Sequence, residues 1–350
     1  MDERVTIYDI AREAGASPAT VSRVLNHSKH PVKQELREKI IKISDKLGYI
    51  PNLQARSLKR QTSNSVGVII PSIANPFYPS IVKGIEDEIV NSNCHMLVFS
   101  SDEDIRRTNY SVETLVAMNV QGIISVYVDE ISEALGKFAA GGGLVLNVTA
   151  NKHAIPCAHT IFVDKVAECK RAMNYLISLG HRNIATIIDT LDISIRISRL
   201  EGYRQALAEA GIPFDDSFVY IYGRDVKKKT EDAAEKGYLL AKAMLKRSPQ
   251  VSAFICMNDS MALGALKAIR EAGKKIPEDY SMVSFDNLIF TDFVYPSFTT
   301  VGYDQYEWGH KLASYYFKLL KDTVKGPAVV QEKDVLSTSK LIIRQSTRQF

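Results

Sequence analysis

The chain has 350 residues, of which 45% are hydrophobic and 24% are charged. These values are typical of globular proteins and exclude disordered, collagen-like and coiled-coil chains, and the length predicts two or three domains. The net charge of +4 is unevenly divided, because residues 1–60 hold 12 Lys and Arg against 7 Asp and Glu, and the remainder holds 32 against 33. A basic head on a nearly neutral body is expected of a nucleic-acid-binding arm, and equally of a solvated helical surface.

The cysteines and the apolar runs predict a soluble cytoplasmic protein. Cys94, Cys157, Cys169 and Cys256 form no CxxC pair, so nothing supports a zinc or thioredoxin-like site, and few scattered cysteines fit a reducing compartment. The N-terminus is charged from its second residue and lacks the apolar core of a signal peptide. The longest apolar run, Phe138–Leu146, has nine residues including three glycines. That is far below the ~18 residues that a membrane-spanning helix needs.

Two short helices joined by a tight turn are predicted at the N-terminus. Thr6 with Asp9 three residues later has the spacing of a capping box, and Gly15 ends the helix that follows. Ser17 is a second cap, with Pro18 at the first helical position, where a missing N–H costs nothing. Two helices separated by a glycine-containing turn of three to four residues form a helix-turn-helix.

The second helix exposes a face that suits the major groove of DNA. A third helix is predicted over about 32–47, so any three-helix bundle would give this pattern. A recognition helix, however, needs small residues near its N-terminus and donors for base edges and phosphates. The outward residues that meet this need are Ser17, Ala19, Thr20, Ser22, Arg23 and Asn26. An isolated Arg23 could also be merely solvated.

From Val5 to Lys59 the sequence resembles the DNA-binding head of the LacI/GalR (lactose-repressor/galactose-repressor) family of bacterial transcription regulators. The motifs that carry the resemblance are VTIYDIAREAGASPATVSRVLN and YIPNLQARSLK. The resemblance implies that phosphate is contacted by Tyr8, Ser17, Ser22, Asn26, His30 and Asn52. It also implies that Arg23 reads a base, and that Pro18 and Ala19 match the pair that varies with the operator. Neither of these two has a side-chain donor, so they can offer only apolar contact.

Residues 51–61 match the hinge helix and linker of that family, which include Ala55. A helix of about eight residues is marginal alone in water, so this one is expected to fold only on DNA beside a partner hinge. By resemblance, Leu58 wedges into a central base step through the minor groove, and Lys59 contacts the same groove. The alternative is a plain linker with a buried leucine.

Beyond residue 64 the pattern changes to short apolar runs separated by amphipathic stretches. The runs are SVGVII, CHMLVFS, VQGIISVYV, GLVLNVT, HRNIATII, FVYIY, VSAFICM and YSMVSFD. Such alternation predicts βαβ units in two doubly wound α/β lobes, each around a parallel sheet. No GxGxxG follows a strand, and Gly141–Gly143 precedes one, which predicts a flexible turn instead of a phosphate cradle. Walker A, GxSxG and HExxH motifs are absent as well, so the sequence predicts neither an enzyme nor a cofactor or metal.

The resemblance continues through this body. It is carried by IIPSIANPFYPSIVKGIE, LISLGHRNIATI, NDSMALGALKAI and IPEDYSMVSFDN, among others. It implies a core like that of periplasmic sugar-binding proteins, with two lobes, three crossovers and a ligand in the cleft. The expected domains are a helix-turn-helix head at 1–50, a hinge at 51–61 and an effector-binding and dimerisation core at 62–350. Lobe one is expected at about 62–163 plus 297–325, and lobe two at about 164–296 plus 326–350.

Several residues of this core are expected to line the cleft, because they lie at strand ends or helix starts and match family positions. They are Phe77, Tyr78, Asn147, Arg199, Asn258, Asp286 and Tyr303. Amides, a guanidinium, a carboxylate and aromatic faces together suit a polyol, whose hydroxyls both donate and accept hydrogen bonds. Each has a structural alternative. Asn258 could cap a helix, Asp286 could be a loop residue, Phe77 could be core, and Arg199 could pair with Glu201 or Asp192.

Two of these positions depart from the family pattern. The family commonly has an acidic or variable polar residue where Asn147 stands, and often has glutamine where Tyr303 stands. A ring with one hydroxyl in place of an amide predicts a larger or more aromatically stacked ligand.

The resemblance implies a regulator, in most family members a repressor, that is controlled by a sugar or a sugar derivative. Two copies would meet a pseudo-palindromic operator whose half-sites lie about one helical turn apart. Since no leucine heptad follows KLIIRQSTR, a dimer is favoured over a tetramer. The alternatives are a solute-binding protein for transport, disfavoured by the head and the absent signal peptide, and an α/β enzyme, disfavoured by the absent catalytic residues.

Overall fold

The computed structural model describes residues 5–25, 30–49, 64–128, 132–151, 155–322 and 326–350. The chain divides into two compact units, Met1–Ser63 and Asn64–Phe350. No helix in the described part of the chain has both the length and the apolar character to cross a membrane.

The N-terminal unit contains three helices, α1 (Ile7–Ala14), α2 (Pro18–Leu25) and α3 (Gln34–Lys46). The predicted capping box is present, because the Asp9 N–H donates to Thr6 Oγ1 at 3.4 Å and the Thr6 N–H donates to Asp9 Oδ2 at 3.0 Å. Gly15 then ends α1 with a φ of 66°, a conformation that glycine adopts at little cost. One small core joins the helices through Ile10, Ala11, Ala14, Val21, Val24 and Ile40. The predicted helix-turn-helix is therefore confirmed.

The first lobe of the second unit is a six-stranded parallel sheet in the order β11-β5-β4-β3-β1-β2. Its strands are β1 (Ser65–Ile70), β2 (His95–Ser100), β3 (Gly122–Val126), β4 (Leu144–Thr149), β5 (His159–Phe162) and β11 (Val329–Gln331). Its helices are α5 (Phe77–Asn91), α6 (Ile105–Ala117), α7 (Glu133–Ala140), α13 (Gln305–Lys321) and α14 (Glu332–Val335). Buried aliphatic strand residues such as Val66, Val68 and Ile124 form its core.

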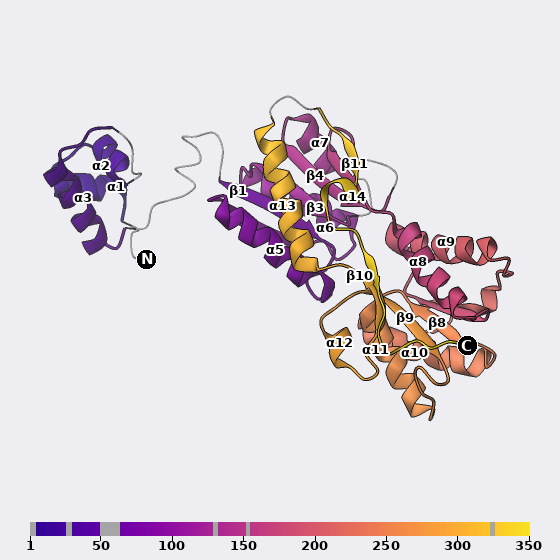
Figure 1. The fold of residues 1–350 in the computed structure, drawn as a ribbon. Coiled ribbons are helices and arrows are strands. Elements are labelled where there is room, and N and C mark those ends of the chain that lie inside the picture. Colours follow the sequence, from indigo (N-terminus) through magenta and orange to yellow (C-terminus); the bar gives the residue numbers. More distant parts are fainter. Residues whose placement is uncertain (1–4, 26–29, 50–63, 129–131, 152–154, 323–325) are drawn as a thin grey trace. The chain divides into compact units, whose positions relative to one another are not determined.

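The second lobe repeats this plan in the order β12-β10-β9-β8-β6-β7, with β12 antiparallel to β10. Its strands are β6 (Ile184–Ile188), β7 (Val219–Ile221), β8 (Ala253–Cys256), β9 (Ser281–Asp286), β10 (Thr299–Gly302) and β12 (Lys340–Ile342). Its helices are α8 (Lys165–Ser178), α9 (Ser194–Glu209), α10 (Ala233–Arg247), α11 (Asp259–Glu271) and α12 (Phe290–Phe293). Figure 1 shows the two lobes joined by chain segments that cross between them, so the predicted two-lobed α/β core is confirmed.

The structure moves two of the expected lobe boundaries. Residues 297–325 were assigned to the first lobe, yet β10 pairs with β9 in the second sheet. Residues 326–350 were assigned to the second lobe, yet β11 pairs with β5 in the first. The crossings therefore follow β5, β10 and α14. Strands of three or four residues carry too little pattern to show which sheet they join, because their backbone partners decide it.

Paired glycines bring two helices of each lobe into close contact. A Cβ atom at Gly84 of α5 would lie 2.1 Å from the Tyr306 carbonyl oxygen, and one at Gly309 of α13 would lie 2.1 Å from that of Ile81. Gly237 of α10 and Gly264 of α11 stand in the same reciprocal relation in the second lobe. Because any side chain here would clash with backbone, these glycines fix the spacing of the helix pairs.

Candidate functional site

The predicted DNA-contacting residues of α1 and α2 lie on the surface of the N-terminal unit. Ser17, Pro18, Ala19 and Arg23 are exposed, Thr20 and Ser22 are half-buried, and Val21 and Val24 face the core. Tyr8 is 73% exposed, and His30 is exposed as well. The Ser17 hydroxyl accepts from the Thr20 N–H at 3.1 Å, which fixes the start of α2. The head therefore presents a polar surface that its own core does not use.

Five predicted DNA contacts lie outside the described residues. They are Asn26, Asn52, Ala55, Leu58 and Lys59. Their roles, including the hinge helix and the leucine wedge, stay predictions.

Arg199 is buried between two carboxylates. It lies inside α9, and so is not at the helix start where the sequence placed it. Its Nη2 lies 3.6 Å from Glu168 and 3.5 Å from Asp286, and its Nη1 donates to the Met257 carbonyl. The pairing with Asp192 or Glu201 that the sequence left open is not formed. Arg199 is thus part of an internal ion-pair cluster.

Lys165 completes this cluster, immediately after the crossing from β5. Its Nζ donates to Glu168 at 2.8 Å, and both side chains are about 95% buried. The same ammonium group lies 5.2 Å from the ring centroid of Tyr127 and 5.8 Å from that of Tyr303. Burial disfavours both charges, but the ion pairs outweigh it, so the pKa of Lys165 is raised and that of Glu168 is lowered. Two cations and two carboxylates therefore neutralise one another inside the protein.

The predicted aromatic residues pack together in the first lobe. The Tyr303 ring stacks on Trp308 with centroids 5.4 Å apart, and lies 6.0 Å from the Phe77 ring. Its hydroxyl is 3.3 Å from that of Tyr127. Phe77 and Tyr78 begin α5 and are buried in the same cluster. Protein thus already occupies one face of Tyr303.

The two predicted amides differ in what they bind. Asn258 is the N-cap of α11, and its Oδ1 accepts from the Met261 N–H at 2.7 Å, which is the capping alternative that the sequence left open. Asn147 lies in β4 with 2% of its surface exposed, and its Oδ1 has no hydrogen-bond partner among the described residues. A buried acceptor without a donor is costly, so Asn147 keeps capacity for a ligand or a water.

A pocket lies between the two lobes, at the carboxyl ends of β2 and β6. The first lobe lines it with Pro71, Tyr78, Ser101, Glu103, Ile105, Thr108, Tyr127 and Val128, and the second with Asp192, Ile193 and Ile195. Its cavity volume is about 30 Å³, which leaves room for water and is far below the roughly 300–1,000 Å³ of ligand-binding pockets. Ile195 also packs against the core of the first lobe. The lobes are thus closed over the pocket, and a larger ligand enters only when they separate.

Of the predicted effector residues, only Tyr78 lines this pocket. The other residues that line the pocket were not predicted from the sequence. The available signal was positional, because loops after the carboxyl ends of parallel strands carry ligand sites in open α/β sheets. Asp102 and Glu103, directly after β2, also have φ values of 49° and 59°. Such a left-handed pair is unusual for side-chain-bearing residues and marks a constrained loop.

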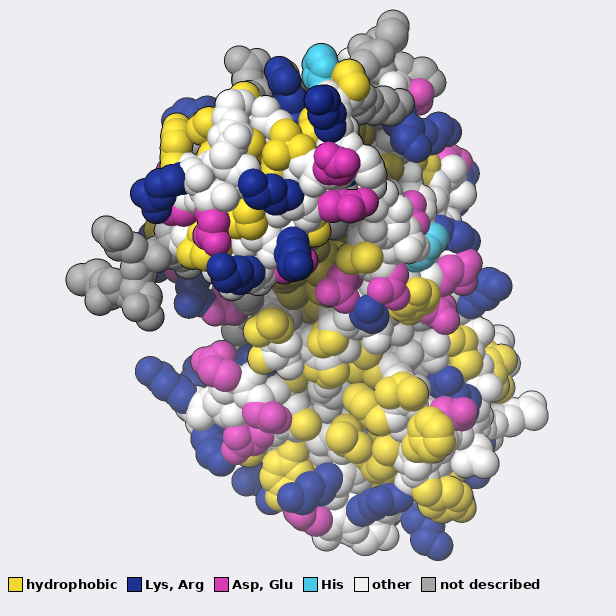
Figure 2. Space-filling view, turned by 90° about the vertical axis from the view of Figure 1, so that its left-hand side faces the viewer, with side chains coloured by type: hydrophobic (Ala, Val, Ile, Leu, Met, Phe, Trp, Pro, Cys, Tyr) yellow, Lys and Arg dark blue, Asp and Glu magenta, His cyan; other side chains and the backbone are white. Residues whose placement is uncertain are grey.

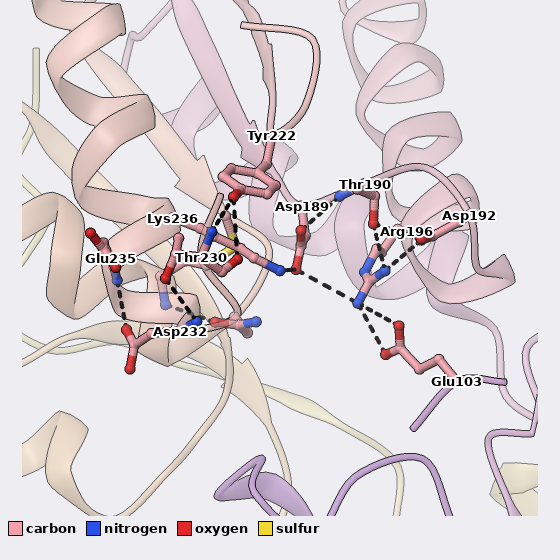
Figure 3. Close-up of polar contacts among 12 residues, drawn as sticks. Glu103, Asp189, Thr190, Asp192, Arg196, Tyr222, Thr230, Asp232, Glu235 and Lys236 are labelled. Carbon is pink, nitrogen blue, oxygen red and sulfur yellow. Dashed lines mark hydrogen bonds and ion pairs between the residues drawn. The ribbon is translucent and has the colours of Figure 1, made fainter. Parts of the chain in front are cut away.

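Charged residues beside the pocket join the lobes (Figure 3). Arg196 of α9 donates from Nη2 to both carboxylate oxygens of Glu103, at 3.0 and 3.1 Å. Its Nη1 contacts Asp192 at 2.5 Å and Thr190 Oγ1 at 3.1 Å. Burial lowers the pKa of Arg196, but Glu103 and the neighbouring aspartates outweigh it, so the pKa is raised and the cation is retained.

Lys236 of α10 extends this network within the second lobe. Its ammonium group lies 3.0 Å from Asp189 Oδ2, and 4.9 Å from the ring centroid of Tyr222. The same Asp189 oxygen lies 3.7 Å from Arg196 Nη2. Asp189 is thus shared by two cations, and both are held in place on the second lobe.

Asp286, from the cluster around Arg199, and its neighbour Asp259 hold their protons more tightly than an ordinary aspartate does. Asp259 accepts from the hydroxyls of Ser284 and Thr300 and from the Leu288 N–H, yet burial and the nearby Asp286 raise its pKa to about 7. Burial also raises the pKa of Asp286 to about 6, against the opposing effects of Arg199 and Lys165. Both groups are therefore protonated in the folded state at a pH where an unfolded aspartate is ionised.

We expect the Asp286→Asn variant to reveal the raised pKa of Asp286 through the pH dependence of its free energy of unfolding. Between pH about 4 and 6 the folded wild type keeps a proton that the unfolded chain has released, so ionisation at Asp286 lowers the free energy of unfolding as pH rises. Asparagine cannot titrate, so the stability of the variant relative to wild type should increase over this interval by about 2 kcal/mol. Urea unfolding at a series of pH values measures the difference.

Asp279→Asn is the control, with the opposite sign. A hydrogen bond from the Lys275 N–H lowers the pKa of the exposed Asp279. Its variant should therefore lose stability relative to wild type as pH rises through the acid range. A flat or falling difference for Asp286→Asn would show that its carboxyl is ionised throughout.

An apolar patch lies on the surface of the second lobe around α12. Ile289 is 83% exposed, Phe293 82% and Tyr295 77%. Figure 2 shows hydrophobic side chains gathered on the face of this lobe that carries α12. Scattered surface leucines or valines need no explanation, but contiguous large apolar groups mark an interaction surface.

Comparisons with known proteins agree with these features. Residues 6–52 match the family described as "Bacterial regulatory proteins, lacI family", and residues 173–347 match a periplasmic binding protein-like domain. The HTH-type transcriptional regulator RegA of Clostridium saccharobutylicum is 33% identical over 347 residues, which cover 98% of this chain and 99% of the relative. DegA of Bacillus subtilis (strain 168), also an HTH-type transcriptional regulator, is 31% identical over 350 residues, 98% of each chain.

Among solved structures, the lac repressor dimer bound to operator and the anti-inducer ONPF matches with a TM-score of 0.82 and 26% identity. The match covers 99% of this chain and 100% of that one. The resemblance drawn from the sequence is confirmed over nearly the whole length. The chain belongs to the lacI family of bacterial regulatory proteins.

Proposed function

We propose that this protein is a homodimeric repressor that binds a pseudo-palindromic operator, and that a sugar-like ligand between the lobes controls its affinity for DNA. The observation that carries the proposal is the exposed polar surface of α2 at the N-terminus of a chain whose second unit holds an interlobe pocket. The lac repressor structure contains both operator and an anti-inducer, which supports the same pairing of functions here. Since its partner is DNA, we expect the protein in the cytoplasm.

The surface of α2 is suited to reading DNA. Arg23 is exposed and has the reach and donor geometry to contact guanine O6 and N7 together. Ser17, Pro18 and Ala19 are small or short, so the backbone at the start of α2 can come close to the groove. The first N–H groups of a helix also favour phosphate.

The apolar patch around α12 supports a dimer. A second copy of the chain would cover Ile289, Phe293 and Tyr295 with the same surface, because a two-fold interface uses one patch twice. Two heads on such a dimer would then meet two half-sites about one helical turn apart.

The interlobe pocket supports control by a ligand. A ligand too large for the closed pocket must separate the lobes. Separating the lobes changes the position of the first lobe relative to the second, and the DNA-binding head precedes the first lobe in the chain. DNA and ligand binding are then coupled, and the coupling is reciprocal, so operator must change ligand affinity by the same factor. The direction of the change distinguishes an inducer from a corepressor.

Replacing Arg23 by alanine should lower operator affinity by about 1–3 kcal/mol, because a guanine contact is lost. It should also relax sequence preference at one position of each half-site. Fluorescence anisotropy with operator and with single-base variants measures both. The control is Lys39→Ala, which removes an exposed charge from α3 instead of from α2. This control should weaken binding to all sequences to a similar, smaller degree. If the two variants lose operator affinity equally, Arg23 does not read a base.

A further inference from the structure

The electrostatics of the interlobe pocket indicate which class of sugar it can take, an inference that rests on the proposed function. Two carboxylates line the pocket, Glu103 from the first lobe and Asp192 from the second. Its other polar groups are the hydroxyls of Tyr78, Tyr127, Ser101 and Thr108, which are neutral. The pocket wall itself therefore contributes negative charge and hydroxyl groups.

The neighbouring cations are all engaged by carboxylates. Arg196 contacts Glu103, Asp192 and Asp189, and Lys236 contacts Asp189. Three carboxylates thus face two cations in this network (Figure 3). The buried Lys165 and Arg199 are likewise paired, with Glu168 and Asp286. Among the described residues of these two clusters, no cation is left for an anionic ligand.

Opening the lobes does not free a cation. Arg196, Asp192 and Asp189 all belong to the second lobe, so their contacts survive when Arg196 separates from Glu103. Glu103 then loses its partner and faces the incoming ligand as an acceptor. A carboxylate accepts hydrogen bonds and cannot donate them, so it suits the hydroxyl groups of a sugar and repels a phosphate.

We propose that the pocket takes an uncharged polyhydroxy ligand, with Glu103 and Asp192 as acceptors for its hydroxyls, and excludes phosphorylated and carboxylated sugars. The pair between Arg196 and Glu103 closes the lobes over the pocket, and a ligand hydroxyl replaces the guanidinium on Glu103 when the lobes open. The carboxylates of Glu103 and Asp192, more than the size of the pocket, determine that uncharged ligands are bound and anionic ones are excluded.

The first test uses inorganic phosphate as the probe and the full chain as the protein. Calorimetry should detect no phosphate binding to the wild type at millimolar concentration. The Glu103→Gln/Asp192→Asn double variant removes two charges and keeps the shape, so Arg196 gains an unpaired face. Phosphate should bind this variant at least tenfold more tightly, and adding Arg196→Gln should abolish the gain.

Controls separate this effect from a general loss of negative charge. Glu133→Gln/Asp279→Asn removes two exposed carboxylates elsewhere, each paired with a lysine, and should gain no phosphate affinity. Circular dichroism and urea unfolding of every variant verify folding. Phosphate binding to the wild type that Arg196→Gln abolishes would overturn the proposal, and so would a double variant that gains nothing.

The second test compares free sugars with their phosphate esters, such as ribose with ribose 5-phosphate and glucose with glucose 6-phosphate. For a sugar that raises the melting temperature, the ester should bind at least tenfold more weakly, and an ester that binds equally well overturns the inference. A panel in which nothing binds refutes the sugar effector of the proposed function, while the phosphate arm still decides the charge preference. Failure of operator binding would refute the repressor separately from both.

Discussion

Replacing Phe293 by glutamate should convert the dimer into monomers and reduce operator affinity by at least a hundredfold. Phe293 is 82% exposed on α12, between Ile289 and Tyr295. In a two-fold interface the substitution places two carboxylates in one apolar contact, and burying an unpaired charge is strongly unfavourable. A monomer contacts a single half-site, so a hundredfold loss, about 2.7 kcal/mol, is a conservative expectation. Sedimentation velocity measures the assembly and anisotropy measures the affinity.

Tyr110→Glu is the matched control for this prediction. Tyr110 lies on α6 of the first lobe and is 68% exposed, so the same charge is introduced at another exposed aromatic side chain. This variant should remain dimeric with unchanged operator affinity. If Phe293→Glu also remains dimeric at micromolar concentration, the patch around α12 is not the interface.

Replacing Arg199 by alanine should destabilise the core by about 3–5 kcal/mol, the cost of removing one partner from a buried ion pair. The guanidinium lies between Glu168 and Asp286, stacks 4.2 Å above the Phe285 ring and is 6% exposed. Its removal leaves a buried carboxylate without its cation and opens a cavity on Phe285. Urea unfolding, monitored by circular dichroism, measures the loss.

The control for Arg199 is Arg106→Ala. Arg106 is 88% exposed and pairs with Asp104 on the surface, so its loss should change stability by less than about 0.5 kcal/mol. The outcome also decides the role of Arg199. A variant that keeps wild-type stability but no longer responds to ligand would make Arg199 a ligand contact, as the family resemblance implied, instead of a structural ion pair.

The sequence predicted the head closely because its signals are local. Thr6, Asp9 and Gly15 fix the ends of α1 through contacts three or four residues apart, and the capping box and the left-handed glycine are both present. The long buried strands of the core were equally visible as apolar runs. The strands β5, β10, β11 and β12 were not predicted, because these short stretches include polar residues such as His159, Thr299 and Gln331 and lack a long apolar run.

The pocket was predicted far less well, for a related reason. Glu103 and Arg196 are 93 residues apart and belong to different lobes, so nothing in either local sequence links them. The partners of Arg199, Glu168 and Asp286, are also distant in the sequence, while the sequence suggested nearby acids. Resemblance to a family directed attention to matching positions, whereas the charged residues of this pocket depend on how the two lobes of this chain meet.

The central claim, that this protein is an operator-binding regulator whose DNA affinity depends on a ligand between its lobes, can be tested by one titration. Operator selected from random DNA with the full chain is titrated by anisotropy at several salt concentrations, with and without a sugar that raises the melting temperature. We predict a selected pseudo-palindrome, a linear fall of log affinity with log salt, and a shift in affinity with the sugar. Selection of no sequence, or an affinity that neither salt nor the sugar changes, would contradict the account.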